Sequence, residues 1–570
     1  MSVLQVKNLC VDFISKDDKF RAVNDLSFSL EKGSTLGIVG ESGSGKSVSV
    51  LSVMRLLSDK KTTYKGEILF CENEKQINLL SLNNRQMQHY RGNRIGMIFQ
   101  EPMTSLNPSM RCGRQITELL QWHLGLSKIK AKEQTIKLLE EVLLPDPQKA
   151  YRSYPHEISG GQKQRIMIAM AIACNPDILI ADEPTTALDV TVQKSILELM
   201  KSLQKKYGMS IIFITHDLGV VAQIADKVLV MYKGNAVEYN KIENLFQNPQ
   251  HPYTQGLLAC RVPANIRLKR LPTVSDFLEK QDFPFVKQEI TTAERKSQIE
   301  KIMATEPILK VRNLHKKYAL PKKFFAKQDY FSAVNDVSFD VYKGETLGLV
   351  GESGCGKTTL GRTLLRLIEP SSGEIFYNNQ NICGLSTAQL RKLRQEIQII
   401  FQDPYSSLNP RYTVGNAILE PMKLHNIFSS DSERKEQVIK LLKRVNLEEK
   451  HFNYYPHQFS GGQRQRICIA RALAVNPQFI ICDESVSALD VSVQAAVLNL
   501  LNELKEEYQL TYIFISHDLS VVKFMSHRVM VMKNERIEEM NEADALYTNP
   551  QSDYTKQLIE AIPMPPRYPL

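Results

Sequence analysis

The chain has 570 residues, 43% of them hydrophobic and 24% charged, which is typical of a soluble protein with two or more domains. The net charge of +10 suits nucleic acid or an anionic membrane surface and selects neither. The sequence shows no apolar signal segment, no run of roughly 20 apolar residues and no Cys-x-x-Cys pair, which argues against secretion, membrane spans and a zinc ribbon.

The first informative element is a β-branched run over Thr35–Gly40 that predicts a buried parallel strand. It leads into a glycine-rich loop and then into a helical stretch, which is the context that a P-loop requires. Glycines let backbone N–H groups approach a phosphate, and the helix N-terminus adds partial positive charge. We predict that Lys46 contacts the β- and γ-phosphates of a nucleotide and that Ser47 ligates Mg²⁺. The predicted nucleotide-binding residues of this loop are Gly40, Ser42, Gly43, Ser44, Gly45, Lys46 and Ser47.

Two acids follow a second apolar run over 178–181. Open α/β sheets bind ligands at the carboxyl ends of their strands, so we expect Asp182 to hold the Mg²⁺ hydration shell and Glu183 to accept a proton from the attacking water. The alternative is a solvated acid pair. A further strand over Ser210–Ile214 is followed by His216, which we predict to contact the γ-phosphate as a catalytic residue, with a purely structural histidine as the alternative.

The segment 263–305 mixes eight basic with six acidic residues and contains three prolines, which predicts a linker with a helix from about Thr292 to Met303.

After this segment the sequence of the first half is repeated. Asp483, Glu484 and His517 each follow their first-half counterparts by 301 residues. The register therefore predicts two domains of similar length, 1–262 and 306–570. The second P-loop comprises Gly351, Ser353, Gly354, Cys355, Gly356, Lys357 and Thr358, with Thr358 and Asp483 as metal ligands and Glu484 and His517 as catalytic residues.

Each half also carries Ser-Gly-Gly-Gln at the start of a predicted helix. With this motif the chain resembles the ATP-binding subunits of ABC transporters. The resemblance implies an α/β fold in which each domain has a RecA-like parallel-sheet core, an antiparallel β subdomain and a helical subdomain. It implies ATP and Mg²⁺ as cofactors, and two domains that close head to tail so that each Ser-Gly-Gly-Gln faces the other domain's P-loop. These motif residues are Ser159, Gly160, Gly161, Gln162, Ser460, Gly461, Gly462 and Gln463.

The same resemblance implies further site residues. Gln100 and Gln402 match a glutamine of the nucleotide site that contacts Mg²⁺ and senses the transmembrane partner. Phe13 and Tyr318 are the predicted adenine-stacking aromatics, with simple core aromatics as the alternative. Two aspartate-containing D-loops match Ala187-Leu188-Asp189 and Ala488-Leu489-Asp490. Neither half lacks a motif, so we predict two competent sites.

The stretches FQEPMTSLNP and NPQHPYT are similar to those of the peptide/nickel importer group, and both domains share one chain as in the fused ATPases of glutathione and microcin-type peptide importers. This implies an ATPase that powers import of peptides or related small solutes through two separate transmembrane permease subunits and, indirectly, a solute-binding protein. The helical subdomains, about 103–157 and 405–458, would receive the permeases. We expect a peripheral protein on the cytoplasmic face of a bacterial inner membrane, with no nucleic acid bound. The alternative is a soluble twin-ABC ATPase acting on ribosomes or nucleic acid.

Overall fold

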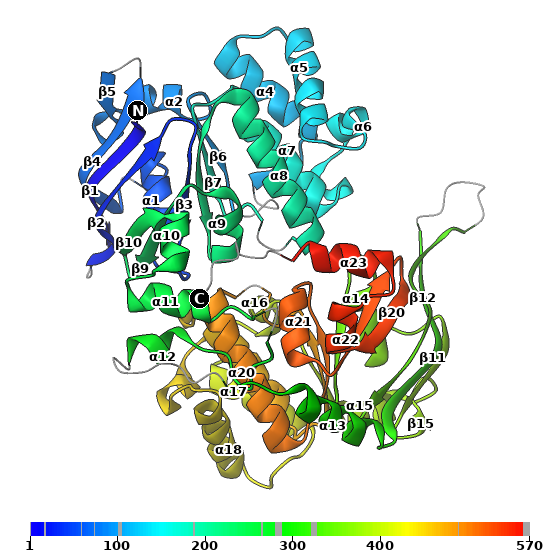
Figure 1. The fold of residues 1–570 in the computed structure, drawn as a ribbon. Helices are drawn as coiled ribbons and strands as arrows, with labels where there is room; N and C mark the ends of the chain where they lie inside the picture. The colour runs from blue at the N-terminus through cyan, green and yellow to red at the C-terminus, as the bar shows by residue number, and fades with distance from the viewer. Residues whose placement is uncertain are drawn as a thin grey trace.

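The computed structural model describes residues 2–15, 19–58, 60–72, 75–100, 105–185, 188–263, 266–279, 288–320, 328–487 and 489–562. The chain forms two domains of the same architecture, joined by a linker that runs along the second (Figure 1). Among these residues, none of the helices is both long enough and apolar enough to cross a bilayer.

A six-stranded sheet forms the centre of each domain, in the orders β10-β9-β3-β8-β7-β6 and β16-β17-β18-β13-β19-β20. All neighbours pair in parallel except the edge strands β10 and β20, which run antiparallel to β9 and β19. Every residue of β3, β7, β13 and β17 is buried, as expected for strands covered on both faces. The strands are β3 (Thr35–Val39), β6 (Ile95–Ile98), β7 (Ile178–Asp182), β8 (Ser210–Thr215), β9 (Lys227–Tyr232), β10 (Asn235–Lys241), β13 (Thr346–Val350), β16 (Ile397–Ile400), β17 (Phe479–Asp483), β18 (Thr511–Ile515), β19 (Arg528–Lys533) and β20 (Arg536–Glu542).

A four-stranded antiparallel sheet forms the second layer of each domain, in the orders β2-β1-β4-β5 and β12-β11-β14-β15. Its apolar face packs with the central sheet into one core per domain. These strands are β1 (Ser2–Ile14), β2 (Lys19–Glu31), β4 (Thr62–Glu72), β5 (Lys75–Asn78), β11 (Pro307–Ala319), β12 (Tyr330–Tyr342), β14 (Ser372–Tyr377) and β15 (Gln380–Asn381).

Helices between β6 and β7, and between β16 and β17, form the helical subdomains, which lie at opposite ends of the molecule (Figure 1). The first comprises α4 (Cys112–Leu124), α5 (Lys128–Glu141), α6 (Pro147–Arg152) and α7 (Gly160–Ile172), and the second α16 (Pro404–Ser407), α17 (Val414–Leu424), α18 (Asp431–Arg444) and α19 (Gly461–Leu473). Other helices of the two domains are α1 (Lys46–Val53), α2 (Asn84–Tyr90), α8 (Val190–Tyr207), α9 (Leu218–Ile224), α10 (Ile242–Gln247), α11 (Pro252–Ala259), α14 (Lys357–Leu364), α15 (Thr387–Glu396), α20 (Val491–Tyr508), α21 (Leu519–Met525), α22 (Ala543–Thr548) and α23 (Asp553–Glu560), with short 3-10 turns at Leu79–Ser81, Pro155–Glu157, Glu449–Asn453 and Pro456–Gln458.

The linker contains α12 (Val274–Leu278) and α13 (Thr292–Met303), and the predicted helix over Thr292–Met303 is confirmed. Thr291 and Glu294 form a capping box at the start of α13, which explains where this helix begins. Leu268, Leu271 and Val274 of the linker join one apolar cluster with residues of both domains. The linker is therefore packed between the domains, although its limits at 263 and 305 stay a prediction.

Candidate active sites

The first P-loop lies between β3 and α1, and its backbone conformation and close packing require glycine at position 45. Gly45 has φ +97°, and a Cβ there would lie 2.7 Å from the Ala22 carbonyl oxygen. Lys46 begins α1, is 5% exposed, and donates from Nζ to the carbonyls of Gly40 at 2.6 Å and Glu41 at 2.9 Å. Burial lowers the pKa of Lys46, while nearby acids act in the opposite direction. The loop thus holds a buried ammonium group where an anionic ligand would neutralise it.

Ser47 and Asp182 meet at the edge of the sheet as the sequence predicts. The Ser47 hydroxyl donates to Asp182 Oδ1 at 3.0 Å. Burial raises the pKa of Asp182 to about 6, although the Ser47 hydrogen bond acts in the opposite direction. A bound cation would favour the charged carboxylate.

The second site repeats this pair: Thr358 Oγ1 donates to Asp483 Oδ1 at 3.0 Å. Asp483 Oδ2 is buried and has no hydrogen-bond partner among the described residues. One hydroxyl and one carboxylate, a set that leaves most metal-coordination positions to phosphate oxygens and water, fit the way proteins bind Mg²⁺ with substrate phosphates. No cluster of three or more acidic, histidine or cysteine side chains suited to a metal occurs in the described part of the chain. The donor set therefore fits a cation that arrives with a nucleotide.

Glu183 follows β7 in a backbone conformation that is unusual for a side chain with a Cβ. Its φ is +47°, and its N–H donates to the Ile214 carbonyl of the neighbouring strand at 3.0 Å. Gln100 Nε2 donates to Glu183 Oε2 at 3.0 Å, and His216 Nδ1 lies 3.5 Å from Glu183 Oε1. Burial disfavours a charged His216, yet Glu183 and neighbouring acids outweigh it and raise the pKa of this imidazole. These contacts hold the Glu183 carboxylate between Gln100 and His216, close enough to Lys46 to affect its pKa.

The second site has the same geometry. Lys357 Nζ donates to the carbonyls of Gly351 at 2.7 Å and Glu352 at 2.9 Å. Glu484 also has φ +47°, accepts from Gln402 Nε2 at 2.8 Å and lies 3.4 Å from His517 Nδ1.

In the second P-loop, Gly356 matches Gly45 of the first, and Cys355 stands where the first has Ser44. Gly356 has φ +102°, and a Cβ there would lie 2.1 Å from the Ala333 carbonyl oxygen. Cys355 is buried, and burial raises the pKa of its thiol, which makes a reactive thiolate unfavourable.

The two Ser-Gly-Gly-Gln motifs begin α7 and α19. Ser159 forms a capping box with Gln162, and Ser460 forms one with Gln463, so in each motif the serine and glutamine fix the start of the helix. Both serines are exposed. Among the residues that the structure describes, no hydrogen bond joins either serine to the opposite P-loop, so their role across the domain interface stays a prediction.

The predicted adenine-stacking aromatics lie on the antiparallel sheets. Phe13 is half-buried on β1 and pairs in register with Phe20 on β2. Strand β2 also contains Ala22, whose carbonyl lies close to Gly45 of the P-loop. Tyr318 is 39% exposed and pairs with Phe331. Both sites thus have an accessible ring on the sheet that borders the P-loop, and stacking on adenine stays a prediction.

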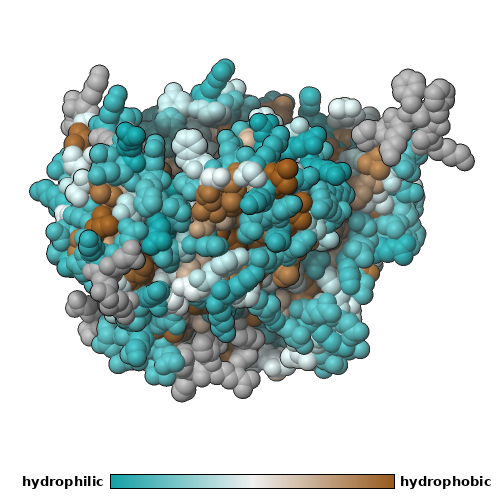
Figure 2. All heavy atoms as spheres, turned by 90° about the horizontal axis from the view of Figure 1, so that it is seen from above, coloured by the Kyte–Doolittle hydropathy of each residue, from teal (hydrophilic) through white to brown (hydrophobic). Residues whose placement is uncertain are grey.

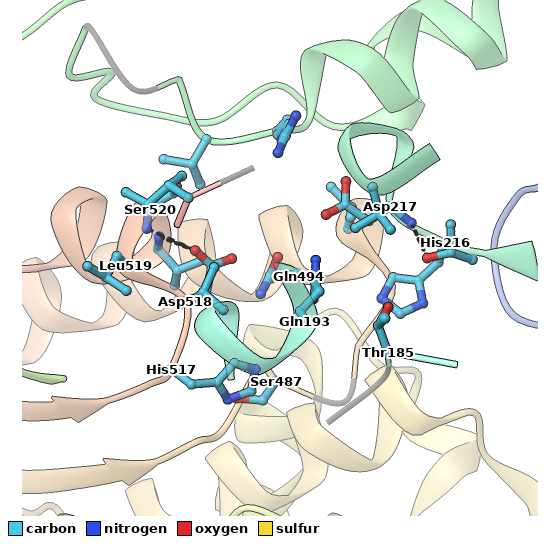
Figure 3. A pocket seen from close by; sticks show the side chains of 18 of the residues that line it. Thr185, Gln193, His216, Asp217, Ser487, Gln494, His517, Asp518, Leu519 and Ser520 are labelled. Atoms are coloured by element: carbon cyan, nitrogen blue, oxygen red, sulfur yellow. Dashed lines mark hydrogen bonds between the residues drawn. The ribbon is translucent and has the colours of Figure 1, made fainter. Parts of the chain in front are cut away.

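The two domains meet at a cavity of about 130 Å³ (Figure 3). His216 and Asp217 line it from the first domain, and His517 and Asp518 line it from the second. Burial raises the pKa of Asp518, and the carboxylate of Asp217, which lines the same cavity, adds to the rise. Beside the cavity, Ser42 N of the first P-loop donates to Asp490 Oδ2 of the second domain at 2.7 Å. The histidines of both sites therefore line one shared interface.

One pair of residues in contact with the P-loops was not predicted. Tyr253 on α11 accepts a hydrogen bond from Glu41 N at 2.9 Å, and Tyr554 on α23 accepts one from Glu352 N at 3.1 Å. Both tyrosines are buried. The only signal in the sequence was the recurrence of Tyr-Thr 301 residues apart. The hydroxyls fix the start of each P-loop from the C-terminal helix of the same domain.

We expect Tyr253→Phe to raise the KM for ATP about fivefold, because the substitution leaves a partly buried N–H without its acceptor at a cost of about 1 kcal/mol. Tyr554→Phe should do the same at the second site. Steady-state ATPase measurements check this. Tyr232→Phe is the control, because it removes a hydroxyl from a neighbouring tyrosine whose ring centroid lies 4.3 Å from that of Tyr253. An unchanged KM in both variants would rule out a supporting role for these hydroxyls.

Together, two P-loops and two sets of acid, glutamine and histidine on parallel sheets define a tandem nucleotide-binding ATPase. A family model described as ABC transporter matches residues 23–186 and 334–487, and one described as the C-terminal region of oligopeptide/dipeptide transporters matches residues 237–279. The chain belongs to the ABC transporter ATP-binding family.

Relatives of known name span nearly the whole chain. The glutathione import ATP-binding protein GsiA of Escherichia coli O6:H1 is 49% identical over 567 residues, covering 99% of this chain and 90% of the relative. GsiA of Salmonella paratyphi A has the same identity and coverage. Among solved structures, a dimeric ATP-binding cassette in a post-hydrolysis state with ADP and phosphate is 31% identical and covers 41% of this chain and 98% of its own, with a TM-score of 0.38.

Proposed function

We propose that this chain is the ATP-hydrolysing subunit of an importer for glutathione or short peptides. It would lie at the cytoplasmic face of the membrane and drive two separate permease subunits, with a solute-binding protein delivering the cargo. Lys46 and Lys357 would hold the phosphates, and Ser47 with Asp182 and Thr358 with Asp483 would bind Mg²⁺ together with them. Mg²⁺ would neutralise phosphate charge, while Glu183 and Glu484 would accept the proton of the attacking water.

The observation that carries this proposal is the occurrence of two sets of P-loop, acid, glutamine and histidine in a chain whose residues 237–279 match the oligopeptide/dipeptide transporter region. Relatives named as glutathione import proteins support glutathione as the first cargo to test. The ribosome-associated alternative has no support among these comparisons.

The proposed permease contact is supported by the surface of the first helical subdomain. Trp122 on α4 and Ile129 on α5 are 78% and 73% exposed. Figure 2 looks down on the face where α4 and α5 lie uppermost in Figure 1, and it shows apolar side chains gathered among hydrophilic ones. Exposed large apolar side chains of this kind are typical of a protein–protein contact.

Purification of the tagged native protein from membranes tests the proposal. We expect two hydrophobic permease subunits to co-purify. We also expect vesicles that contain the complex, with the ATPase on the inside, to take up labelled glutathione when ATP and Mg²⁺ are enclosed in the vesicles. Uptake of a dipeptide but not of glutathione would change the cargo and keep the function. Recovery with ribosomes and without permeases would contradict it.

A further inference from the structure

The aspartate that begins α20 reaches across the domain interface. Asp490 accepts from Ser42 N through Oδ2 at 2.7 Å, and its Oδ1 lies 3.9 Å from His216 Nδ1. The same nitrogen lies 3.5 Å from Glu183. His216 of the first site therefore stands between one acid of each domain, and Asp490 makes no side-chain cap for its own helix.

The counterpart of Asp490 makes different contacts. Asp189 begins α8 and caps that helix, because its Oδ1 accepts from Val192 N at 3.0 Å and from Thr191 Oγ1 at 2.7 Å. Within the described ranges, no hydrogen bond joins Asp189 to the second P-loop. Two aspartates at the same position of the repeat thus serve different partners, one across the interface and one within its own domain.

The two helices that follow these aspartates, α20 and α8, also differ in their contacts with the linker. Asn499 on α20 is 7% exposed and holds the linker by two hydrogen bonds, donating to the Leu271 carbonyl and accepting from Leu271 N, both at 2.8 Å. Its counterpart on α8 is Glu198, which is exposed. The linker therefore docks on the helix that carries Asp490, and its described residues make no such pair of hydrogen bonds with the helix that carries Asp189.

Two buried arginines fix the linker to the second domain at further points. Arg267 donates to the Ser526 carbonyl at 3.1 Å and pairs with Asp544 at 3.1 Å, and Arg295 of α13 donates to the same carbonyl. Their side chains are 7% and 8% exposed. Charged donors that are this deeply buried are ordered by their acceptors, so the linker is a fixed part of the second domain rather than a loose tether.

The linker is also joined to the first P-loop. α12 packs on α11 at Gly256, where a Cβ would lie 3.0 Å from Val274 Cα. Tyr253 on α11 holds Glu41 N of the first P-loop. The first P-loop is therefore connected to α20 in two ways. One is a series of contacts through α11, α12 and the linker to Asn499, and the other is the direct hydrogen bond from Ser42 to Asp490.

We propose that the docked linker holds α20 so that Asp490 keeps the first ATP site assembled before ATP binds, whereas the second site is completed only as ATP binds. Asp490 is then a positioning residue that acts through Ser42 and His216. The inference rests on the proposed ATPase function. A wild-type chain without Mg²⁺-dependent ATP turnover would count against that function, whereas the tests below concern only the difference between the sites.

The first test compares Asp490→Ala with Asp189→Ala in the full chain. Asp490→Ala should lower kcat about 10-fold or more with little change in Tm, because it removes a positioning contact and no helix cap. Asp189→Ala should lower Tm by about 1–2 °C through loss of its cap, and lower kcat by a smaller factor. An equal fall of kcat in the two variants would overturn the proposal.

The second test follows assembly without relying on turnover. Ser42→Cys with Asp490→Cys forms one cysteine pair, and Ser353→Cys with Asp189→Cys forms the matched pair, each detected after mild oxidation by peptide mass spectrometry. We expect the first disulfide without nucleotide and the second only with ATP and Mg²⁺. Adding Asn499→Ala should slow the first, whereas Glu198→Ala should not. Equal rates for the two pairs without nucleotide would overturn the proposal.

Discussion

Replacing Glu183 by Gln is expected to lower ATP hydrolysis at the first site by about 10²- to 10⁴-fold, because the amide cannot accept the proton of the attacking water. The side chain keeps its size and its hydrogen bond to Gln100 has a matching acceptor, so ATP affinity should change little. Glu484→Gln should act in the same way at the second site. Release of phosphate at saturating ATP, with ATP binding measured in parallel, checks this.

The comparison of single and double variants carries the most information. We expect each single variant to lose most of its steady-state turnover and the double variant to lose all of it, because the histidines of both sites line one interface. Glu198→Gln, on the exposed face of α8, is the control for a charge change. Full turnover in either single variant would show that the two sites are not both required.

Lys46→Ala is expected to weaken ATP binding at the first site by about 10- to 150-fold. The ammonium group is buried among carbonyls of the P-loop, and each hydrogen bond of a charged group contributes about 1.5–3 kcal/mol. Titration with a fluorescent ATP analogue should therefore find one tight site instead of two. Lys357→Ala should remove the other site.

Lys32→Ala provides the control for the lysine variants, because it removes the same charge from an exposed position of the same domain. Its binding curve should match that of the unaltered chain. Two tight sites in Lys46→Ala would mean that this lysine does not contact the nucleotide.

Much of the fold follows from local patterns. The β-branched runs at Thr35 and Ile178 became fully buried strands because parallel strands are covered on both faces. The loop between β3 and α1 was predictable since its glycines and lysine form a motif with a definite geometry. The helix over Thr292–Met303 was predictable because its capping residues and helix formers are contiguous. The helical stretch predicted after the first P-loop is α1, which ends at Val53.

The contacts between distant residues were not predictable in the same way. Tyr253 meets Glu41 across 212 residues, and Asp490 meets Ser42 across 448. A single sequence shows that such residues recur but not which partner each chooses. The two aspartates illustrate this, because Asp189 and Asp490 stand in nearly identical segments and yet bind different groups. The choice depends on how the linker packs, and no local pattern encodes that packing.

The apolar cluster that includes Val39 of the first domain, Leu271 of the linker and Leu498 of the second has a consequence for stability. Since these side chains belong to one hydrophobic core, displacing α11 would expose apolar surface of both halves to water at once. A free energy of unfolding then belongs to the whole chain, and a substitution in one half is not expected to add simply to one in the other. The duplicated halves are thus alike in sequence pattern but inseparable as cooperative units.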